Sequence, residues 1–282
     1  MHRILSREVL APDIVRVWVD APQVARKRRP GQFVIVRLGE GGERIPLTIA
    51  DADAARGAIA LVVQGVGKTT RELNALAPGA AIRDVAGPLG RPTEIDPNHH
   101  VCCVGGGIGA AVVLPIAKAL QCAGGRVVTI LGARTRDLVI LEDEARAVSA
   151  ACVVTTDDGS YGRRGLVTDA LADLIARGQT FDEVVAVGPL PMMRAVCELT
   201  AALGVRTIVS LNPVMVDGTG MCGGCRVTVG GEQKFVCVDG PEFDGHQVDF
   251  GELMARLTAY REQELAASAR AASDAPHEPI AW

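Results

Sequence analysis

The chain has 282 residues, of which 48% are apolar, and this is enough to fill the cores of two or three modest domains. Its 29 Lys and Arg residues against 33 Asp and Glu residues give a net charge of -4, which excludes a general electrostatic attraction to nucleic acid or to an anionic membrane. Charged residues interrupt the N-terminus where a signal peptide would have a continuous apolar segment. No uncharged apolar run approaches the roughly 18 residues that span a bilayer. We therefore expect a cytoplasmic protein.

The first part of the chain predicts an antiparallel β-barrel, because short β-branched runs alternate there with turn signals. The runs cover residues 14–19, 32–38, 45–49 and 58–63, and one helix is expected over residues 68–76. We assign the barrel to residues 1–97, where a polar linker that begins at Asp96 separates it from the second domain.

Residues 98–211 predict an α/β domain, because strands and helices alternate and the strands are continuously apolar, as in a buried parallel sheet. The expected strands cover residues 101–104, 126–131, 151–155, 183–187 and 207–210. The expected helices cover residues 112–122, 142–148, 166–176 and 192–203.

The last part of the chain begins with a small cysteine-rich segment over residues 212–249. A hairpin is expected within it, with strands at 226–229 and 234–236 joined by Gly230 and Gly231. A C-terminal helix over residues 250–264 and a loosely ordered Ala/Ser-rich tail over residues 265–282 complete the chain. The predicted fold class is therefore α/β plus β, with a barrel, a parallel-sheet domain and a small C-terminal segment.

A candidate phosphate site lies in the barrel, where Arg44 precedes Pro46, Leu47 and Thr48 in the pattern Arg-x-Pro-x-Thr. Farther along, a helix opens with a second group of candidates, namely Gly65, Gly67, Lys68 and Thr69. The last three invite comparison with a nucleotide-binding P-loop, but that motif needs a glycine where this chain has Val62. A helix N-terminus rich in Gly, Lys and Thr instead suits a phosphate-bearing cofactor on the barrel.

A glycine loop stands between the first strand and the first helix of the α/β domain. Its glycines are Gly105, Gly106, Gly107 and Gly109. Backbone N–H groups and the helix dipole favour a pyrophosphate at such a place, although glycine at a tight turn is also an adequate structural explanation. A typical NAD site has an acidic residue after the next strand, where this chain has Arg134.

Two further loops succeed strands of the same sheet. One contains Thr156, Asp157 and Asp158, and the other contains Gly188 and Pro189. Turn chemistry alone can produce such residues. Because the carboxyl ends of parallel strands meet at one edge, three such loops together favour a nucleotide-binding site there.

The most specific motif lies in the cysteine-rich segment, where Asp217, Cys222 and Cys225 are followed by Cys237. The spacings x4, x2 and x11 match a plant-type [2Fe-2S] run in which aspartate takes the first position. Glycines between the ligands would let backbone N–H groups approach the cluster sulfides. A structural zinc site is the alternative that the spacing leaves open.

The five other cysteines are expected to be small buried thiols in strands and helices. They are Cys102, Cys103, Cys122, Cys152 and Cys197.

The barrel motif, the glycine loop and the cysteine segment together resemble the ferredoxin-NADP reductase superfamily over residues 1–260. More narrowly, residues 212–225 and 237–246 are similar to the electron-transfer subunit of dihydroorotate dehydrogenase. They are more similar still to the small subunits of sulfide dehydrogenase and of NADH-dependent ferredoxin:NADP oxidoreductase. Aspartate rather than cysteine at position 217 favours the second group.

The resemblance implies an oxidoreductase subunit that holds FAD in the barrel, NAD(H) or NADP(H) on the sheet domain and a [2Fe-2S] cluster in the segment after it. Arg44 would contact the flavin phosphates, Thr48 would approach the isoalloxazine, and residues 67–69 would support the pyrophosphate. No catalytic acid or base is expected, because the cofactors carry the chemistry.

The resemblance also implies a larger partner subunit near residues 212–245, similar to a glutamate-synthase-like flavoprotein with [4Fe-4S] clusters, and ferredoxin as a reactant of that complex. Two other functions stay open at this point. One is electron transfer in dihydroorotate oxidation, and the other is a zinc-stabilised nucleotide-binding regulatory module.

Overall fold

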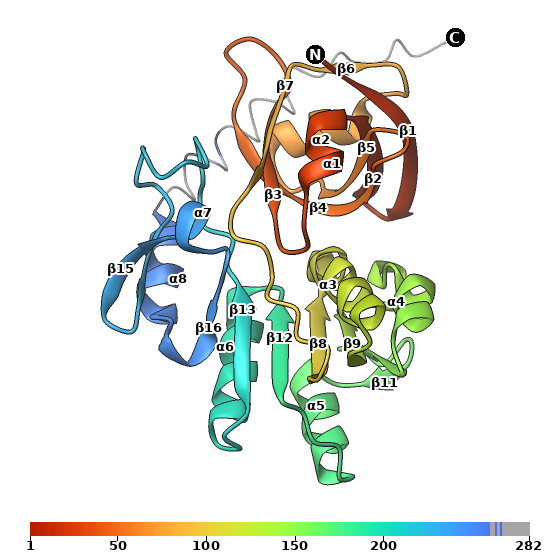
Figure 1. Cartoon of the computed structure of the whole chain (residues 1–282), viewed down its shortest axis with the longest axis vertical. Helices are drawn as coiled ribbons and strands as arrows, with labels where there is room; N and C mark the ends of the chain where they lie inside the picture. Colours follow the sequence, from red (N-terminus) through yellow and green to blue (C-terminus); the bar gives the residue numbers. More distant parts are fainter. Residues whose placement is uncertain (260–262, 264–265, 267–282) are drawn as a thin grey trace.

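The computed structural model describes residues 1–259, 263 and 266. Figure 1 shows the barrel at the top, the parallel sheet below it, and the cysteine-rich segment, in blue, beside that sheet. No helix among these described residues is both long and apolar enough to cross a membrane.

The N-terminal sheet is a nearly closed antiparallel barrel, as predicted, with strand order β6-β1-β2-β5-β4-β3-β7. Its core is built by alternation: Val15, Val17 and Val19 point inward from one strand, and Ile59 and Leu61 from its neighbour. Its strands are β1 (His2–Ala11), β2 (Ile14–Asp20), β3 (Phe33–Arg37), β4 (Ile45–Asp53), β5 (Ala58–Gln64), β6 (Ala81–Ile82) and β7 (Asp84–Leu89). Two short helices, α1 (Pro22–Lys27) and α2 (Lys68–Ala75), accompany the strands.

The second sheet has the order β11-β10-β9-β8-β12-β13-β16, and all its pairs are parallel except the last. Its strands are β8 (His100–Gly106), β9 (Arg126–Ala133), β10 (Ala151–Thr156), β11 (Arg163–Arg164), β12 (Glu183–Val187), β13 (Arg206–Ser210) and β16 (Glu242–Asp244). Strand β8 lies between β9 and β12, so the chain adds strands first on one side of β8 and then on the other. Open α/β sheets bind ligands at such a switch point.

Helices cover both faces of this sheet, which explains why its strands are apolar throughout. From β8, Val101 and Cys103 pack with the residues of one helix, whereas Cys102 and Val104 pack with helices on the opposite face. The four helices are α3 (Ala110–Ala123), α4 (Glu142–Val148), α5 (Val167–Ala176) and α6 (Leu190–Ala201). Helix α4 has the bounds that the sequence predicts.

The C-terminal segment contains the predicted hairpin, formed by β14 (Arg226–Val229) and β15 (Glu232–Phe235), and then α7 (Val236–Asp239) and α8 (Phe250–Thr258). Gly230 and Gly231 have φ of +60° and +78°, the backbone that a tight two-residue turn needs. Helix α8 is described as far as Thr258, and the tail predicted over 265–282 lies outside the described residues apart from Ala266.

Cys102, Cys103 and Cys197 are buried and Cys152 is half-buried, as expected for small core thiols. Cys122 is exposed instead, because it lies in the last turn of α3 near the surface.

Candidate functional site

A cavity of about 870 Å³ opens between the barrel and the carboxyl edge of the parallel sheet. This is within the size range of cofactor pockets. Residues from all three parts of the chain line it, including Thr48 of the barrel, Gly107 of the sheet domain and Met215 of the cysteine-rich segment.

On the barrel side, the cavity is lined by Pro46, Leu47 and Thr48 of β4. Arg44 lies outside the lining and is exposed, near the carboxylate of Asp84 on β7. The Arg-x-Pro-x-Thr motif therefore brings three of its four predicted residues to the cavity wall.

The N-terminus of α2 reaches the same cavity through Thr70. The backbone N–H of Gly67 donates to Thr70 Oγ1 at 3.0 Å, and Lys68 beside it is exposed. The hydroxyl of Thr69 is buried and donates to the carboxylate of Glu43, so its side chain has a partner already. All four predicted residues here lie next to the lining rather than in it, namely Gly65, Gly67, Lys68 and Thr69.

The glycine loop lies at the opposite wall, where Gly106 and Gly107 line the cavity. A Cβ on Gly105 would lie 2.9 Å from the Cα of Ala110, and one on Gly109 would lie 2.0 Å from the carbonyl oxygen of Val187. These two glycines are therefore required for close packing of β8, α3 and β12. Helix α3 has no side-chain N-cap and follows directly on a 3₁₀ turn over Gly107–Gly109, in which the N–H of Ala110 donates to the carbonyl of Gly107. Ala111 and Val112 line the cavity, so the positive end of the helix dipole lies there and favours an anion.

The remaining predicted strand ends divide between the cavity and its surroundings. Arg134, Asp157, Gly188 and Pro189 line it. Thr156 is buried behind it, with its hydroxyl donating to the carbonyl of Tyr161 at 2.7 Å. Asp158 instead accepts from the backbone and hydroxyl of Ser160, which lowers the pKa of Asp158 through those hydrogen bonds.

Sequence reasoning missed several residues of the lining. They include Phe33, Gln64, Ser210, Asn212, Met215 and Pro241. Ser210 could have been found, because it lies at the carboxyl end of a predicted parallel strand. The others carry no local motif.

The cysteine-rich loop brings its four candidate ligands together in two pairs. Cys225 and Cys237 are buried with their sulfurs 3.2 Å apart. Asp217 and Cys222 lie together as well, because the backbone N–H of Cys222 donates to Asp217 Oδ2 at 2.7 Å. The described part of the chain holds no group of three or more His, Cys, Asp or Glu residues that would surround one metal ion. Two pairs of ligands are what a two-iron cluster requires, since each iron takes two protein ligands.

Backbone amides already point at the sulfurs of this loop. The N–H of Gly224 donates to Cys222 Sγ at 3.5 Å, and the N–H of Cys237 donates to Cys225 Sγ at 3.4 Å. Left-handed backbone at Gly220 and Gly223, with φ of +87° and +65°, gives the loop this shape. Such donors stabilise ligand thiolates, so the residues present fit an iron–sulfur cluster.

Charge at these ligands is set by burial and by hydrogen bonds. Hydrogen bonds from the backbone of Thr219 and Cys222 lower the pKa of Asp217, which keeps this carboxylate ionised. Burial raises the pKa of Cys237 to about 12. Cation binding must therefore drive the release of this thiol proton, as is general for thiolate ligands.

The cysteine loop also rests on the barrel. A Cβ on Gly218 would lie 2.7 Å from Leu89 Cδ1 and 2.8 Å from Ile35 Cγ1. Only glycine allows this approach, which places the loop directly against the strands β3 and β7. The candidate cluster site therefore lies against the same barrel that forms one wall of the cavity.

Glu242 of β16 lies at the junction of the three parts of the chain. Its Oε1 accepts from Thr93 Oγ1 at 2.6 Å, and a Cβ on Gly31 would lie 2.6 Å from the same oxygen. Burial raises its pKa to about 7, with the nearby carboxylates of Glu183 and Glu94 adding to the effect.

We expect Glu242 to make the protein less stable as the pH rises. Its folded-state pKa lies above the ordinary glutamate value of 4.5, so its favourable contribution is complete below pH 4.5 and is lost as the pH rises through about 7. The loss is at most about 3 kcal/mol. Chemical denaturation of Glu242→Gln between pH 4 and 8 should show a smaller fall in unfolding free energy than the wild type. Glu40→Gln, at an exposed glutamate of the barrel that is not among the groups acting on Glu242, should reproduce the wild-type curve.

Two parts of the chain match known domain families. Residues 212–249 match the family described as the iron-sulfur cluster binding domain of dihydroorotate dehydrogenase B, and residues 103–198 match the oxidoreductase NAD-binding domain. The dihydroorotate dehydrogenase B (NAD(+)) electron transfer subunit homolog of Thermotoga maritima is 52% identical over 265 residues, which cover 94% of this chain and 93% of that protein.

Two more matches extend over most of the chain. The dihydroorotate dehydrogenase B (NAD(+)) electron transfer subunit of Geobacillus thermodenitrificans is 34% identical and covers 87% of this chain and 96% of its own length. Among solved structures, a chain from work on flavin-based electron bifurcation by the NADH-dependent reduced ferredoxin-NADP oxidoreductase has a TM-score of 0.91. It is 50% identical, and the match covers 96% of this chain and 97% of that one.

Proposed function

The chain belongs to the family of dihydroorotate dehydrogenase B electron transfer subunits and their homologues, and we propose that it passes electrons between a nicotinamide nucleotide, FAD and a [2Fe-2S] cluster within a ferredoxin:NADP oxidoreductase complex. It is an electron-transfer subunit of an oxidoreductase, with an iron–sulfur domain and an NAD-binding domain. The observation that carries the finer proposal is that the barrel, the glycine loop and the cysteine-rich segment line one shared cavity. The 50% identical chain from a ferredoxin-NADP oxidoreductase supports it.

In this proposal residues 1–97 hold FAD, residues 98–211 receive the nucleotide and residues 212–249 ligate the cluster. The flavin ring would contact Pro46, Leu47 and Thr48, because these residues of β4 line the cavity. The N-terminus of α2, with Gly67 and Lys68, would bind its phosphates together with Arg44. Thr69 would contribute its backbone N–H alone, since Glu43 occupies its hydroxyl.

The nucleotide would lie across the switch point of the sheet. The positive N-terminal end of α3 would face its pyrophosphate, with Gly106 and Gly107 leaving room for it. Arg134 and Asp157 line the cavity and would face its ribose. Reduced nicotinamide would then give a hydride to FAD and leave as the oxidised nucleotide, and the flavin can release the two electrons singly to the cluster.

Anaerobic purification followed by flavin, iron and sulfide analysis tests the proposal. We expect about one flavin and about two irons with two sulfides per chain, and bleaching of both visible chromophores on addition of NADH. Colourless, iron-free protein would overturn it and would favour the zinc-stabilised regulatory module instead.

We also propose that Asp217 ligates the cluster. Its carboxylate lies in the loop beside Cys222, held by the amides of Thr219 and Cys222. Asp217→Cys should keep the iron content but shift the reduction potential and the visible spectrum, because a soft thiolate replaces a hard carboxylate. Asp239→Asn changes an acid of the same segment that caps the N–H of Phe235, and it should leave both unchanged. A wild-type potential and spectrum in Asp217→Cys would remove this ligand assignment.

A larger partner subunit would receive the electrons, and we propose that it is a flavoprotein with [4Fe-4S] clusters, similar to glutamate synthase flavoproteins. The loop around the cluster exposes apolar side chains that a partner would cover, among them Met221 at 88% exposed and Val216 at 46%. Ferredoxin would react with the complex. Copurification of the native complex tests this, and a lone chain that reduces NADP with ferredoxin would contradict it. A partner that binds FMN and oxidises dihydroorotate would favour the second candidate, to which the 34% identical relative points.

A further inference from the structure

The two walls of the cavity belong to separate units that meet at a mainly apolar contact. Ala50 and Val62 of the barrel pack there with Ala110, Ala111 and Leu114 of α3. Three of these five residues are alanines, whose short side chains interdigitate less than large ones do. Polar contacts at the edge of this contact can therefore add to what fixes the orientation of α3 against the barrel.

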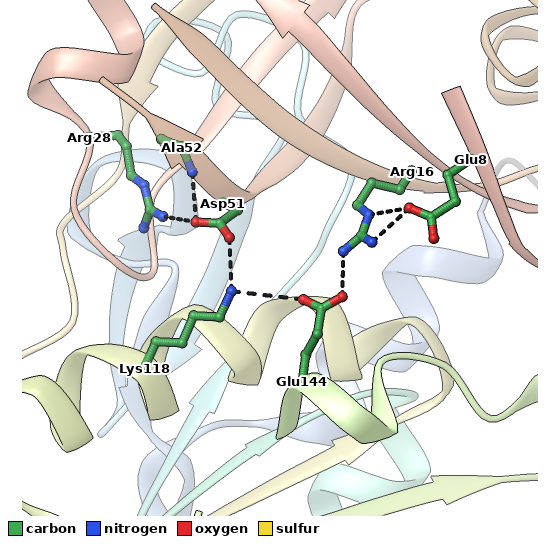
Figure 2. A network of polar contacts seen from close by, with 7 residues as sticks. All are labelled: Glu8, Arg16, Arg28, Asp51, Ala52, Lys118 and Glu144. Carbon is green, nitrogen blue, oxygen red and sulfur yellow. Dashed lines mark hydrogen bonds and ion pairs between the residues drawn. The ribbon is translucent and has the colours of Figure 1, made fainter. Parts of the chain in front are cut away.

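A chain of ion pairs crosses this contact (Figure 2). We call it the interdomain charge chain and define it as Glu8, Arg16, Glu144, Lys118, Asp51 and Arg28, in the order in which they touch. Charges of opposite sign alternate along it, so the chain as a whole is neutral. The barrel supplies four of these residues, and the sheet domain supplies Lys118 and Glu144.

The contacts of the charge chain are short where it crosses between the units. Lys118 Nζ lies 2.8 Å from Asp51 Oδ2, and Arg16 Nη1 lies 2.6 Å from Glu144 Oε1. Lys118 also lies 3.8 Å from Glu144 Oε2, so α3 and α4 are joined to each other as well as to the barrel. All four side chains are between 20% and 36% exposed, which leaves them less screened by solvent than fully exposed pairs.

Asp51 is held in place on the barrel from three sides. Its Oδ1 accepts from the N–H of Ala52 at 2.8 Å and from Arg28 Nη2 at 3.2 Å, while Lys118 bonds its other oxygen. Burial opposes ionisation of Asp51, but the hydrogen bonds from Lys118 and Ala52 outweigh it and lower the pKa of Asp51. The carboxylate is therefore a fixed anchor for Lys118.

The Lys118–Asp51 pair joins the two elements that build the cavity. Asp51 lies on β4, three residues beyond Thr48, which lines the barrel wall. Lys118 lies on α3, the helix that begins directly after the glycine loop. A shift of α3 along β4 would therefore change the separation between Thr48 and Gly107 as well as the geometry of this pair.

We propose that Lys118 and Asp51 are positioning residues, which with Glu144 and Arg16 set the separation between the flavin wall and the nucleotide wall of the cavity. This inference rests on the proposed function, since hydride transfer needs two cofactors in contact. Because neither residue lines the cavity, their loss should slow hydride transfer while leaving the binding of each cofactor intact. Displacement of reacting groups by about 1 Å costs up to about a hundredfold in rate.

The test is a double-mutant cycle on the holoprotein, with flavin reduction at saturating NADH followed by stopped flow. Lys118→Met and Asp51→Asn should each slow flavin reduction by about tenfold or more, and the double variant should be no slower than the single ones. FAD content and the Kd for NADH should stay within about twofold of wild type. Lys118→Arg, which keeps the charge, should retain most of the rate.

Arg146→Met is the matched control, because it removes a 2.6 Å ion pair to Glu142 that lies wholly within α4. Its rate should equal that of the wild type. A second variant, Arg16→Met, removes the other short pair that crosses between the units and should also slow flavin reduction. If Lys118→Met or Asp51→Asn fails to fold, Arg16→Met still tests the inference, and a wild-type rate in it would contradict the inference.

Wild-type rates in Lys118→Met and Asp51→Asn would overturn the inference, as would independent, additive losses or a loss of FAD or NADH binding. Equal loss in Arg146→Met would overturn it too. Failure of the proposed function looks different, because wild-type protein would then contain no flavin or would not be reduced by NADH.

Discussion

Serine at position 237 is expected to leave the protein without its iron–sulfur cluster. Cys237 is buried with its sulfur 3.2 Å from that of Cys225, and a serine hydroxyl, which is a harder ligand and gives up its proton less readily than a thiol, replaces a thiolate poorly. Iron should fall well below about two atoms per chain. Substitution of a residue that only supports a metal ligand costs roughly tenfold to hundredfold in activity. Loss of a ligand itself should reduce electron transfer from the flavin to a further acceptor by more than that. Reduction of the flavin by NADH should persist, because the cavity lining does not include Cys237.

Iron and sulfide analysis, visible spectra and NADH-dependent reduction of an artificial acceptor measure this outcome. Cys122→Ser is the matched control, since Cys122 is an exposed cysteine in the last turn of α3 whose sulfur contacts only the side chain of Gln121 among the polar partners described. It should keep full iron and activity. A Cys237→Ser protein with unchanged iron and spectrum would show that the cluster, if present, uses other ligands.

The sequence predicts the parts of this fold whose signals are local. Helix α4 begins with Glu142, Asp143 and Glu144 and carries Arg146 in its last turn, so charges match the helix dipole at both ends and fix its bounds. The parallel strands are readable because helices cover both faces and leave them apolar throughout.

Strands that depend on their neighbours were missed. In β1 only Ile4 and Ala11 are buried, and Arg3, Arg7 and Glu8 hide any alternation. This strand forms because β2 and β6 pair with it on either side. Strand β7 contains Pro88, which reads as a break in a sequence but is tolerated at the end of the sheet order.

The residues of the candidate site likewise fall into those with a local sequence signal and those without one. The glycine loop and the cysteine loop are continuous in sequence, so their residues could be named before their geometry was known. Phe33, Gln64 and Met215 line the same cavity but are far apart in the chain. The tertiary fold alone brings them together. The interdomain charge chain is also invisible in sequence, because Asp51 and Lys118 are 67 residues apart.

Gly109→Ala is expected to weaken NADH binding by at least about tenfold while sparing the flavin and the cluster. Gly109 has an ordinary helical φ of -59°, so an alanine there would not strain the backbone. Lack of space for the Cβ is what excludes alanine. A Cβ there would lie 2.0 Å from the Val187 carbonyl oxygen and 2.6 Å from its carbon, and backbone atoms of a central strand cannot yield. The start of α3 must move away from β12, which should cost about 1–3 kcal/mol of stability. The same movement displaces the helix N-terminus proposed to face the pyrophosphate.

Titration with NADH and stopped-flow reduction of the flavin should show at least about a tenfold loss, of the order expected for misplaced binding groups, whereas dithionite should still reduce both cofactors. Gly124→Ala is the control for destabilisation alone, because Gly124 caps the other end of α3 with φ of +96° and nothing lies within 4 Å of its Cβ position. Left-handed backbone strain there costs about 1–2 kcal/mol, similar to the first variant, but it leaves the loop unmoved. If both variants bound NADH as the wild type does, the glycine loop would be a packing device, and the nucleotide would have to bind elsewhere along the sheet edge.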